Sequence, residues 1–186
     1  MDYLKLSDIC YIISKGKNSS LGTTGNINML TFPILTSNGE ISDYNNIAKS
    51  YLENPYLDLK TYNVENKDII FSINFRNNLL IKQLNIIGPI ENTIYSSRVA
   101  YIRVNPEKYN SDFLFQLLNS PDYIRKLENE VYSPGVISQI SIERLKNFEV
   151  PNIPLEQQKE ILQKQTHLKN KISTLTKQLD ELFTNF

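Results

Sequence analysis

Residues 151–186 read PNIPLEQQKEILQKQTHLKNKISTLTKQLDELFTNF, and this stretch decides how the chain is organised. Its apolar side chains recur at alternating steps of three and four residues. The seam consists of Ile161, Leu168, Ile172, Leu175, Leu179 and Leu182, with Gln165 at its one polar position. Two such columns are typical of a coiled coil, whereas a helix on a globular surface has a broader apolar stripe. We therefore expect the seam to contact a second helix; the alternative is a core helix packed on its own domain.

The limits of this helix can be predicted from its first turn. Pro154 suits that turn because its missing N–H would have no partner there. Glu156 and Glu160 place negative charge near the positive end of the helix dipole. We predict a dimerisation arm over residues 154–186, which acts as a helical spacer, and a head over residues 1–153.

Composition bounds the class of protein. The chain has 186 residues, of which 40% are hydrophobic and 22% charged, as in an ordinary soluble protein. No apolar run approaches the roughly 20 residues that a membrane span needs, and the N-terminus does not have the layout of a signal peptide. The lone Cys10 cannot form an intramolecular disulfide, which favours a reducing compartment. We expect a cytoplasmic protein.

The formal net charge is zero. A protein that binds nucleic acid regardless of sequence is usually basic, because phosphate contacts supply its affinity. If this chain binds DNA, it needs local basic loops or a partner that grips the backbone.

The head alternates short strand and helix patterns, which indicates the α+β class with a mixed sheet. Predicted strands cover residues 29–35, 69–73, 79–87 and 93–104, with a short one at 4–6. Predicted helices cover residues 9–13, 113–118 and 123–131, and a small apolar-periodic unit covers 142–148. Asn110 or Ser111 caps the second of these helices, and Ser120-Pro121-Asp122 opens the third with a cap, a first-turn proline and an acidic residue. Residues 14–28 form a long polar loop, and residues 36–66 are mixed and rich in turns.

Catalytic signals in the head are incomplete. Residues 54–56 lack the second proline of an amino-methyltransferase motif, and residues 16–19 lack the second glycine of a phosphate loop. Asp122, Glu128 and Glu130 lie on a predicted helix without a catalytic lysine, so they are better interpreted as solvated charges. His167 is the one histidine and has no second metal ligand nearby. We predict a binding protein that is not an enzyme and holds no metal or cofactor.

Two polar loops carry the side chains that read DNA bases. Lysine and arginine can donate to guanine, and asparagine can bond adenine through the oxygen and the nitrogen of its side-chain amide. The candidates are Lys15, Lys17, Asn18, Ser19 and Ser20 in the first loop, and Asn74, Arg76, Asn77 and Asn78 in the second. The alternative is that both are ordinary solvated loops.

Motifs in a fixed order resemble the DNA-specificity (S) subunit of type I restriction–modification systems. Residues 6–9 and 14–17 resemble the family's opening strand, short helix and glycine loop. Residues 67–72 resemble a later strand of the family, with Lys67 in place of its usual glycine. Residues 97–104 and 113–120 follow the family's strand-then-helix order. The closing motif comprises Gly135, Ile140-Ser141, Leu145, Val150-Pro151, Ile153-Pro154-Leu155, Gln158 and Ile161. Family members usually hold two target-recognition heads and two spacers, whereas this chain holds one of each and resembles a half-subunit.

The resemblance implies a non-catalytic DNA-sequence-specificity subunit whose head is a target-recognition domain. The head would read one half of a bipartite site in double-stranded DNA, and the arm would pair antiparallel with a second arm. A homodimer would then read two inverted half-sites. DNA adenine methyltransferase (M) subunits would bind this scaffold, and the motor–nuclease (R) subunit is a further candidate partner. The alternative is a helical decoy that binds methylation subunits without reading DNA sequence.

Overall fold

The computed structural model describes residues 2–75, 79–133 and 138–184. Contacts divide the chain into two compact units, Met1–Asn152 and Ile153–Phe186. The first unit mixes strands with short helices, and the second is a single helix. The predicted α+β class is therefore confirmed.

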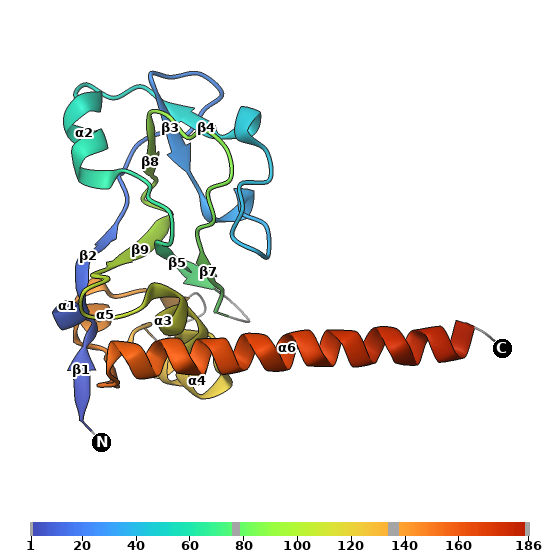
Figure 1. The fold of residues 1–186 in the computed structure, drawn as a ribbon. Helices are drawn as coiled ribbons and strands as arrows, with labels where there is room; N and C mark the ends of the chain where they lie inside the picture. Colours follow the sequence, from blue (N-terminus) through green and yellow to red (C-terminus); the bar gives the residue numbers. More distant parts are fainter. Residues whose placement is uncertain (1, 76–78, 134–137, 185–186) are drawn as a thin grey trace. The chain divides into compact units, whose positions relative to one another are not determined.

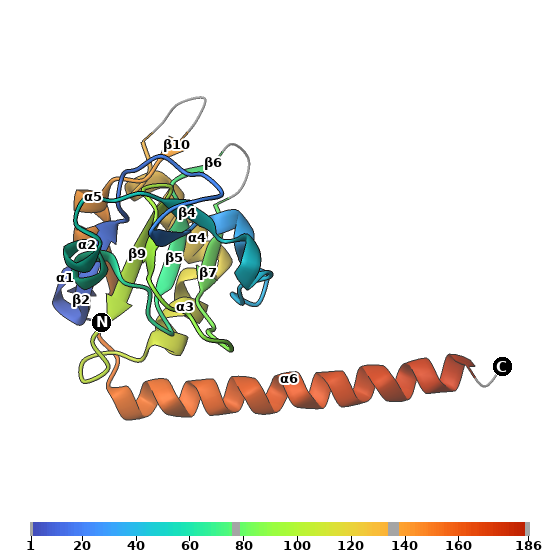
Figure 2. The same ribbon diagram turned by 90° about the horizontal axis from the view of Figure 1, so that it is seen from above.

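A four-stranded antiparallel sheet runs through the middle of the first unit (Figure 1). Its strands follow the order β2 (Cys10–Lys15), β9 (Val99–Val104), β5 (Ile69–Ser72) and β7 (Ile81–Gln83), and Figure 2 shows them side by side. The two inner strands are rich in β-branched and aromatic residues, which favour extended backbone. Most of their side chains are buried, so both faces of the sheet have to be covered.

A three-stranded sheet covers one of these faces. It consists of β4 (Ala48–Ser50), β3 (Ile27–Leu30) and β8 (Thr93–Tyr95); β3 pairs antiparallel with β4 and parallel with β8. Tyr95 of β8 stacks on Tyr101 of β9, with 4.2 Å between the ring centroids. Both rings belong to a buried apolar cluster that joins the two sheets.

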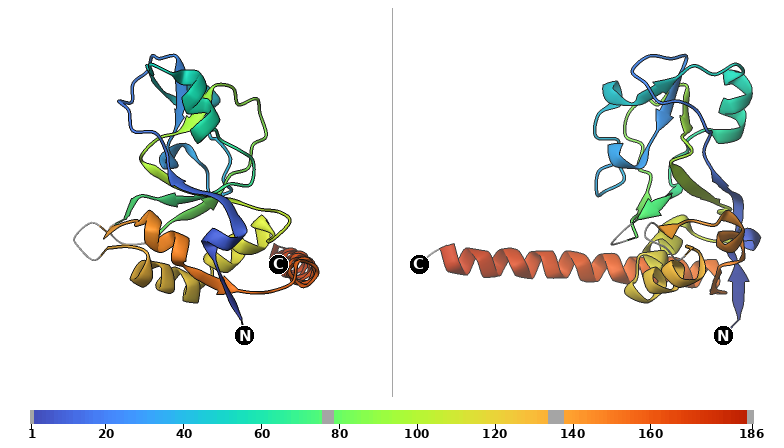
Figure 3. Two further views of the ribbon diagram at one scale, coloured as in Figure 1. Left: turned by 90° about the vertical axis from the view of Figure 1, so that its left-hand side faces the viewer. Right: turned by 180° about the vertical axis from the view of Figure 1, so that it is seen from behind.

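Helices cover the opposite face of the four-stranded sheet, as Figures 1 and 3 show from different sides. They are α3 (Ser111–Leu118), α4 (Pro121–Glu130) and α5 (Ile142–Asn147). The Asn110 side chain caps α3 by accepting a hydrogen bond from the Phe113 backbone at 2.9 Å. Both α3 and α4 were predicted from such capping patterns, and both predictions are confirmed.

Two pairs of very short strands complete the unit. β1 (Tyr3–Lys5) pairs antiparallel with β11 (Glu149–Pro151), and β6 (Asn74–Phe75) pairs antiparallel with β10 (Ser138–Gln139). The remaining elements are α1 (Leu6–Ile9), α2 (Pro55–Tyr62) and the 3-10 helices Phe32–Ile34 and Tyr44–Asn46.

The helix predicted over residues 9–13 is wrong. Helix α1 ends at Ile9, and the next six residues form strand β2. Its Cys10-Tyr11-Ile12-Ile13 segment has strand-forming side chains, and pairing with β9 satisfies its backbone groups. The predicted polar loop over residues 14–28 is shorter at both ends, because β2 continues to Lys15 and β3 begins at Ile27.

The single strand predicted over residues 93–104 is also wrong. The chain turns at residues 96–98, so β8 and β9 belong to different sheets. The Ser96 backbone N–H donates to the Leu30 carbonyl, and the Val99 N–H donates to the Ser96 carbonyl, each at 3.0 Å. The second bond closes the turn, and the first attaches it to β3, a strand far away in the sequence.

The second unit contains helix α6 (Leu155–Thr184). Four seam side chains are more than half exposed: Leu168 (56%), Ile172 (63%), Leu175 (56%) and Leu179 (53%). A stripe of large apolar side chains in solvent is unusual for a folded protein and marks a surface that another molecule can cover. Among the described residues, no helix is long and apolar enough to cross a membrane.

Candidate nucleic-acid interface

The loop over residues 16–26, which joins β2 to β3, is ordered by backbone hydrogen bonds. Near its start, Gly16 N–H donates to the Val99 carbonyl at 3.1 Å, and Lys17 N–H donates to the Tyr95 carbonyl at 2.8 Å. In its middle, Gly22 and Lys49 exchange two hydrogen bonds of 2.8 Å. The loop is therefore a fixed surface, and its side chains are presented at defined positions.

Gly16 is required for this close approach. A Cβ atom at this position would lie 2.2 Å from the Tyr95 carbonyl oxygen and 2.4 Å from that of Ser96, both of which are backbone atoms. A larger residue would therefore push the loop away from the β8–β9 turn. The glycine brings the predicted binding residues next to that turn.

The far end of the loop is held by one side chain. Asn26 donates from Nδ2 to the Leu52 carbonyl and accepts from the Leu52 N–H at Oδ1, both at 2.9 Å. Its own N–H donates to the Ser50 carbonyl at 3.0 Å. The loop is thus joined to β8 at one end and to the segment after β4 at the other.

The predicted residues of the first loop differ in exposure. Asn18 and Ser20 are exposed, whereas Lys15 and Ser19 are partly buried. The Ser97 hydroxyl donates to Asn18 Oδ1 at 3.3 Å, which links the loop to the β8–β9 turn. Lys17, Asn18, Ser19 and Ser20 line one groove, whereas Lys15 is the last residue of β2 and does not line it.

Lys17 forms an ion pair within the head. Its Nζ lies 2.7 Å from Oδ1 of Asp58, whose side chain is only 8% exposed. The hydrogen bond to Asp58 is the main cause of a raised pKa at Lys17. This pair fixes the loop against helix α2, so any contact of Lys17 with DNA has to compete with Asp58.

The second predicted loop can be placed only in part. Asn74 lies on β6, where its backbone pairs with Gln139. Arg76, Asn77 and Asn78 lie outside the described residues.

Several exposed side chains beside the first loop were not among the predicted site residues. Tyr51 is 75% exposed, and Tyr56 and Leu57, at the start of α2, are 81% and 56% exposed. A groove of about 360 Å³ lies here, and its lining residues are Lys17, Asn18, Ser19, Ser20, Tyr51, Leu52, Glu53, Asn54, Leu57 and Asp58. The Asn54-Pro55 pair is a helix-start signal that could have placed α2 here.

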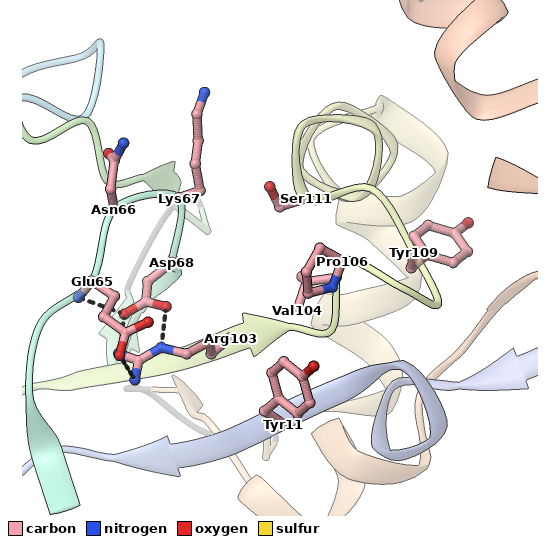
Figure 4. A pocket seen from close by; sticks show the side chains of 10 residues that line it. All are labelled: Tyr11, Glu65, Asn66, Lys67, Asp68, Arg103, Val104, Pro106, Tyr109 and Ser111. Atoms are coloured by element: carbon pink, nitrogen blue, oxygen red, sulfur yellow. Dashed lines mark hydrogen bonds and ion pairs between the residues drawn. The ribbon is translucent and has the colours of Figure 1, made fainter. Parts of the chain in front are cut away.

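A second cavity, of about 370 Å³, lies at the opposite end of β9 and contains a buried ion pair (Figure 4). Arg103 donates from Nε to Asp68 Oδ1 at 2.9 Å and from Nη2 to Asp68 Oδ2 at 2.8 Å. Oδ2 also accepts from the Tyr95 hydroxyl at 2.9 Å and from the Glu65 N–H at 3.1 Å. Burial raises the pKa of Asp68, and the Arg103 guanidinium opposes this rise.

The charged side chains around this cavity form hydrogen bonds and ion pairs with neighbouring residues of the head. Arg103 also donates to Glu65 Oε1 at 2.6 Å and to the Asn63 carbonyl at 2.9 Å. Lys67, with its Nζ 2.8 Å from Asp112, has a backbone φ of 70°, in the left-handed region that favours glycine. The network joins the turn before β5 to β9, which is a structural role.

The Cys10 thiol of the head is not an activated nucleophile. Burial raises the pKa of Cys10 to about 12, so its thiol is protonated near neutral pH and a poor nucleophile. No group of three or more histidine, cysteine, aspartate or glutamate side chains able to hold a metal ion occurs among the described residues. Exposed amide, hydroxyl and guanidinium groups on fixed turns suit the recognition of a polar surface.

The seam predicted on the arm lies on one continuous helix. Leu168, Ile172, Leu175 and Leu179 are exposed, and Ile161 is partly buried. Leu182 lies within α6, but its side chain is outside the description.

Comparisons with known proteins agree on one family. The family model described as the type I restriction modification DNA specificity domain matches residues 1–183. No curated protein matches the chain significantly.

Solved structures share the fold at low sequence identity. One, of a type I R-M system studied for complex assembly and conformational transition, has a TM-score of 0.64 at 14% identity, over 94% of this chain and 39% of that one. The HsdS subunit from Thermoanaerobacter tengcongensis has a TM-score of 0.60 at 14% identity, over 95% and 39%. The S subunit from M. genitalium has a TM-score of 0.54 at 13% identity, over 94% of this chain and 40% of that one. The chain spans about two-fifths of the length of these proteins.

Proposed function

The chain belongs to the type I restriction modification DNA specificity domain family, and from this membership we propose that it is a DNA-sequence-specificity subunit. It reads one half of a bipartite site in double-stranded DNA. The observation that carries the proposal is the match of the family model over residues 1–183. The fixed polar loop beside the β8–β9 turn supports it, because rigid presentation of donors and acceptors reduces the entropy lost on binding.

The target-recognition surface lies on the first unit. We assign DNA contacts to Lys15, Lys17, Asn18, Ser19 and Ser20, and to Asn74, Arg76, Asn77 and Asn78. The exposed amides and hydroxyls of the first loop are suited to base edges and phosphates. Because the net charge is zero, partner proteins supply much of the binding affinity for the DNA phosphates.

The arm holds two heads apart. A second copy of the chain covers the apolar seam, which comprises Ile161, Leu168, Ile172, Leu175, Leu179 and Leu182, and the resulting homodimer reads two inverted half-sites. DNA adenine methyltransferase (M) subunits bind this scaffold in the cytoplasm, and the motor–nuclease (R) subunit joins the assembled complex. The chain itself is non-catalytic, and methylation is carried out by the M subunits.

Mapping of methylated adenines in cells tests this function. Cells express the cognate M subunit alone, with the wild-type chain, or with the Leu175→Asp variant. A new bipartite motif that requires the wild-type chain supports the specificity role, and an inverted repeat in it supports the homodimer. The seam variant should lose the motif while its head stays folded. If a stable complex with M subunits forms but yields no motif, the chain does not direct methylation.

A further inference from the structure

We propose that Arg98, in the turn between β8 and β9, reads a guanine in the half-site. This inference rests on the proposed DNA-specificity function and adds a residue that was not among the predicted contacts. Three observations carry it: the turn is fixed, the exposed guanidinium makes no hydrogen bond or ion pair with the described residues, and the groove beside it has no other charged residue in its lining.

The turn is fixed from both sides. The Ser96 hydroxyl accepts from the Arg98 N–H at 3.3 Å, and the Ser97 N–H donates to the Lys17 carbonyl at 2.8 Å. The Ser97 hydroxyl also bonds Asn18. Arg98 is therefore attached to the same loop that carries the predicted contacts, and its Cα position is set before any ligand arrives.

The Arg98 side chain is exposed, and in the described part of the chain its guanidinium makes no hydrogen bond or ion pair. This distinguishes it from Arg103, which is paired with Asp68 and Glu65, and from Arg125, which is paired with Asp122. Arg98 can contact a ligand without breaking an interaction inside the protein.

A groove of about 430 Å³ lies beside Arg98, and all its other lining residues are uncharged. They are Leu21, Gly22, Thr23, Thr31, Pro33 and Ala48. A track of phosphates is normally met by several cations, whereas this groove supplies one guanidinium beside methyl and methylene groups. That combination suits base edges in the major groove, where the arginine fork donates to guanine O6 and N7 and apolar groups contact a thymine methyl.

The experiment compares wild-type chain, Arg98→Ala, Arg98→Lys and the control Arg144→Ala. Arg144 is a second exposed arginine, on α5, which covers the opposite face of the four-stranded sheet (Figure 1). The adenine methylation motif is mapped for each chain with the M subunit, and thermal melts confirm that each variant is folded. Binding of each chain–M complex is then measured to the wild-type site and to every single-base-pair substitution of it.

We expect Arg98→Ala to lose discrimination at one G·C pair by about tenfold or more, with the other positions of the motif retained. Arg98→Lys should not restore it, because a lysine ammonium does not have the planar fork. Arg144→Ala should give the wild-type motif.

Other outcomes overturn the inference. An equal loss of affinity at every sequence would make Arg98 a phosphate contact, and an unchanged motif would remove it from the interface. Weakened assembly with M at an unchanged motif would assign Arg98 to a protein contact. A wild-type motif without any G·C pair would also exclude a contact between Arg98 and guanine. If the wild-type chain directs no motif, it is the proposed function that fails.

Discussion

Replacing Arg103 by methionine should reveal how much the buried ion pair contributes to the head. The Asp68 side chain is 1% exposed, and its Oδ1 accepts from Arg103 Nε, a contact that methionine cannot make. Loss of one partner from a buried ion pair typically costs about 3–5 kcal/mol, because the other charge is left uncompensated. For a chain of this size, that predicts a melting temperature lower by roughly 10 °C.

The free energy of unfolding that Arg103→Met loses should depend on pH, and the loss should be smaller at lower pH. Burial already raises the pKa of Asp68, and removal of Arg103 removes the charge that opposes this rise. A carboxyl whose pKa is higher in the folded state than in the unfolded state stabilises the fold when protonated. The difference in the free energy of unfolding between the wild-type chain and Arg103→Met should therefore be large near pH 7. It should shrink as the pH falls toward about 4, the usual aspartate pKa.

Urea unfolding followed by circular dichroism at pH 7 and pH 5 measures this deficit. Arg125→Met is the matched control, because the Arg125–Asp122 pair is 72% and 85% exposed and such pairs contribute about 0–1 kcal/mol. Asp68→Asn combined with Arg103→Met should be more stable than Arg103→Met alone. A loss below about 1 kcal/mol, or an equal loss at both pH values, would refute the reasoning.

Three further predictions concern other features. Lys67→Gly should unfold at higher urea than Lys67→Ala, because glycine relieves a φ of 70° that costs other residues about 1–2 kcal/mol; the reverse order would show that the turn carries no strain. Leu175→Asp should convert a dimer into monomers in sedimentation or light scattering, whereas Ser173→Asp, on the other side of α6, should not; an unchanged mass for Leu175→Asp would exclude the seam as the contact. The Cys10 thiol, whose pKa burial raises to about 12, should react with a disulfide reagent at pH 8 far more slowly in the folded chain than in urea, and similar rates would contradict the raised pKa.

Local signals in the sequence were sufficient for the helices with capping residues and for the arm. Asn110 predicted α3, Ser120-Pro121 predicted α4, and the seam predicted α6, because each depends on residues within a few turns. Strand β2 was mistaken for a helix, since its backbone is satisfied by β9, about ninety residues later. Distant pairing of this kind leaves no local signal.

The candidate site was predictable to a similar extent. The polar composition of residues 16–20 indicated a binding loop, but its ion pair with Asp58 depends on a helix that the sequence analysis did not find. Arg98 was overlooked because it was placed inside a strand, and the turn there is fixed by Leu30 and Lys17. A serine pair before an arginine carries little turn signal by itself.

The pairing of β1 with β11 has a consequence for how such heads can be exchanged. The chain enters the first unit through β1 and leaves it through β11, and these two strands are neighbours. A different head bounded by the same two strands could therefore be inserted between the same two places in the chain. If the head reads DNA as proposed, recombination at these two places would join the same arm to a different target in one step.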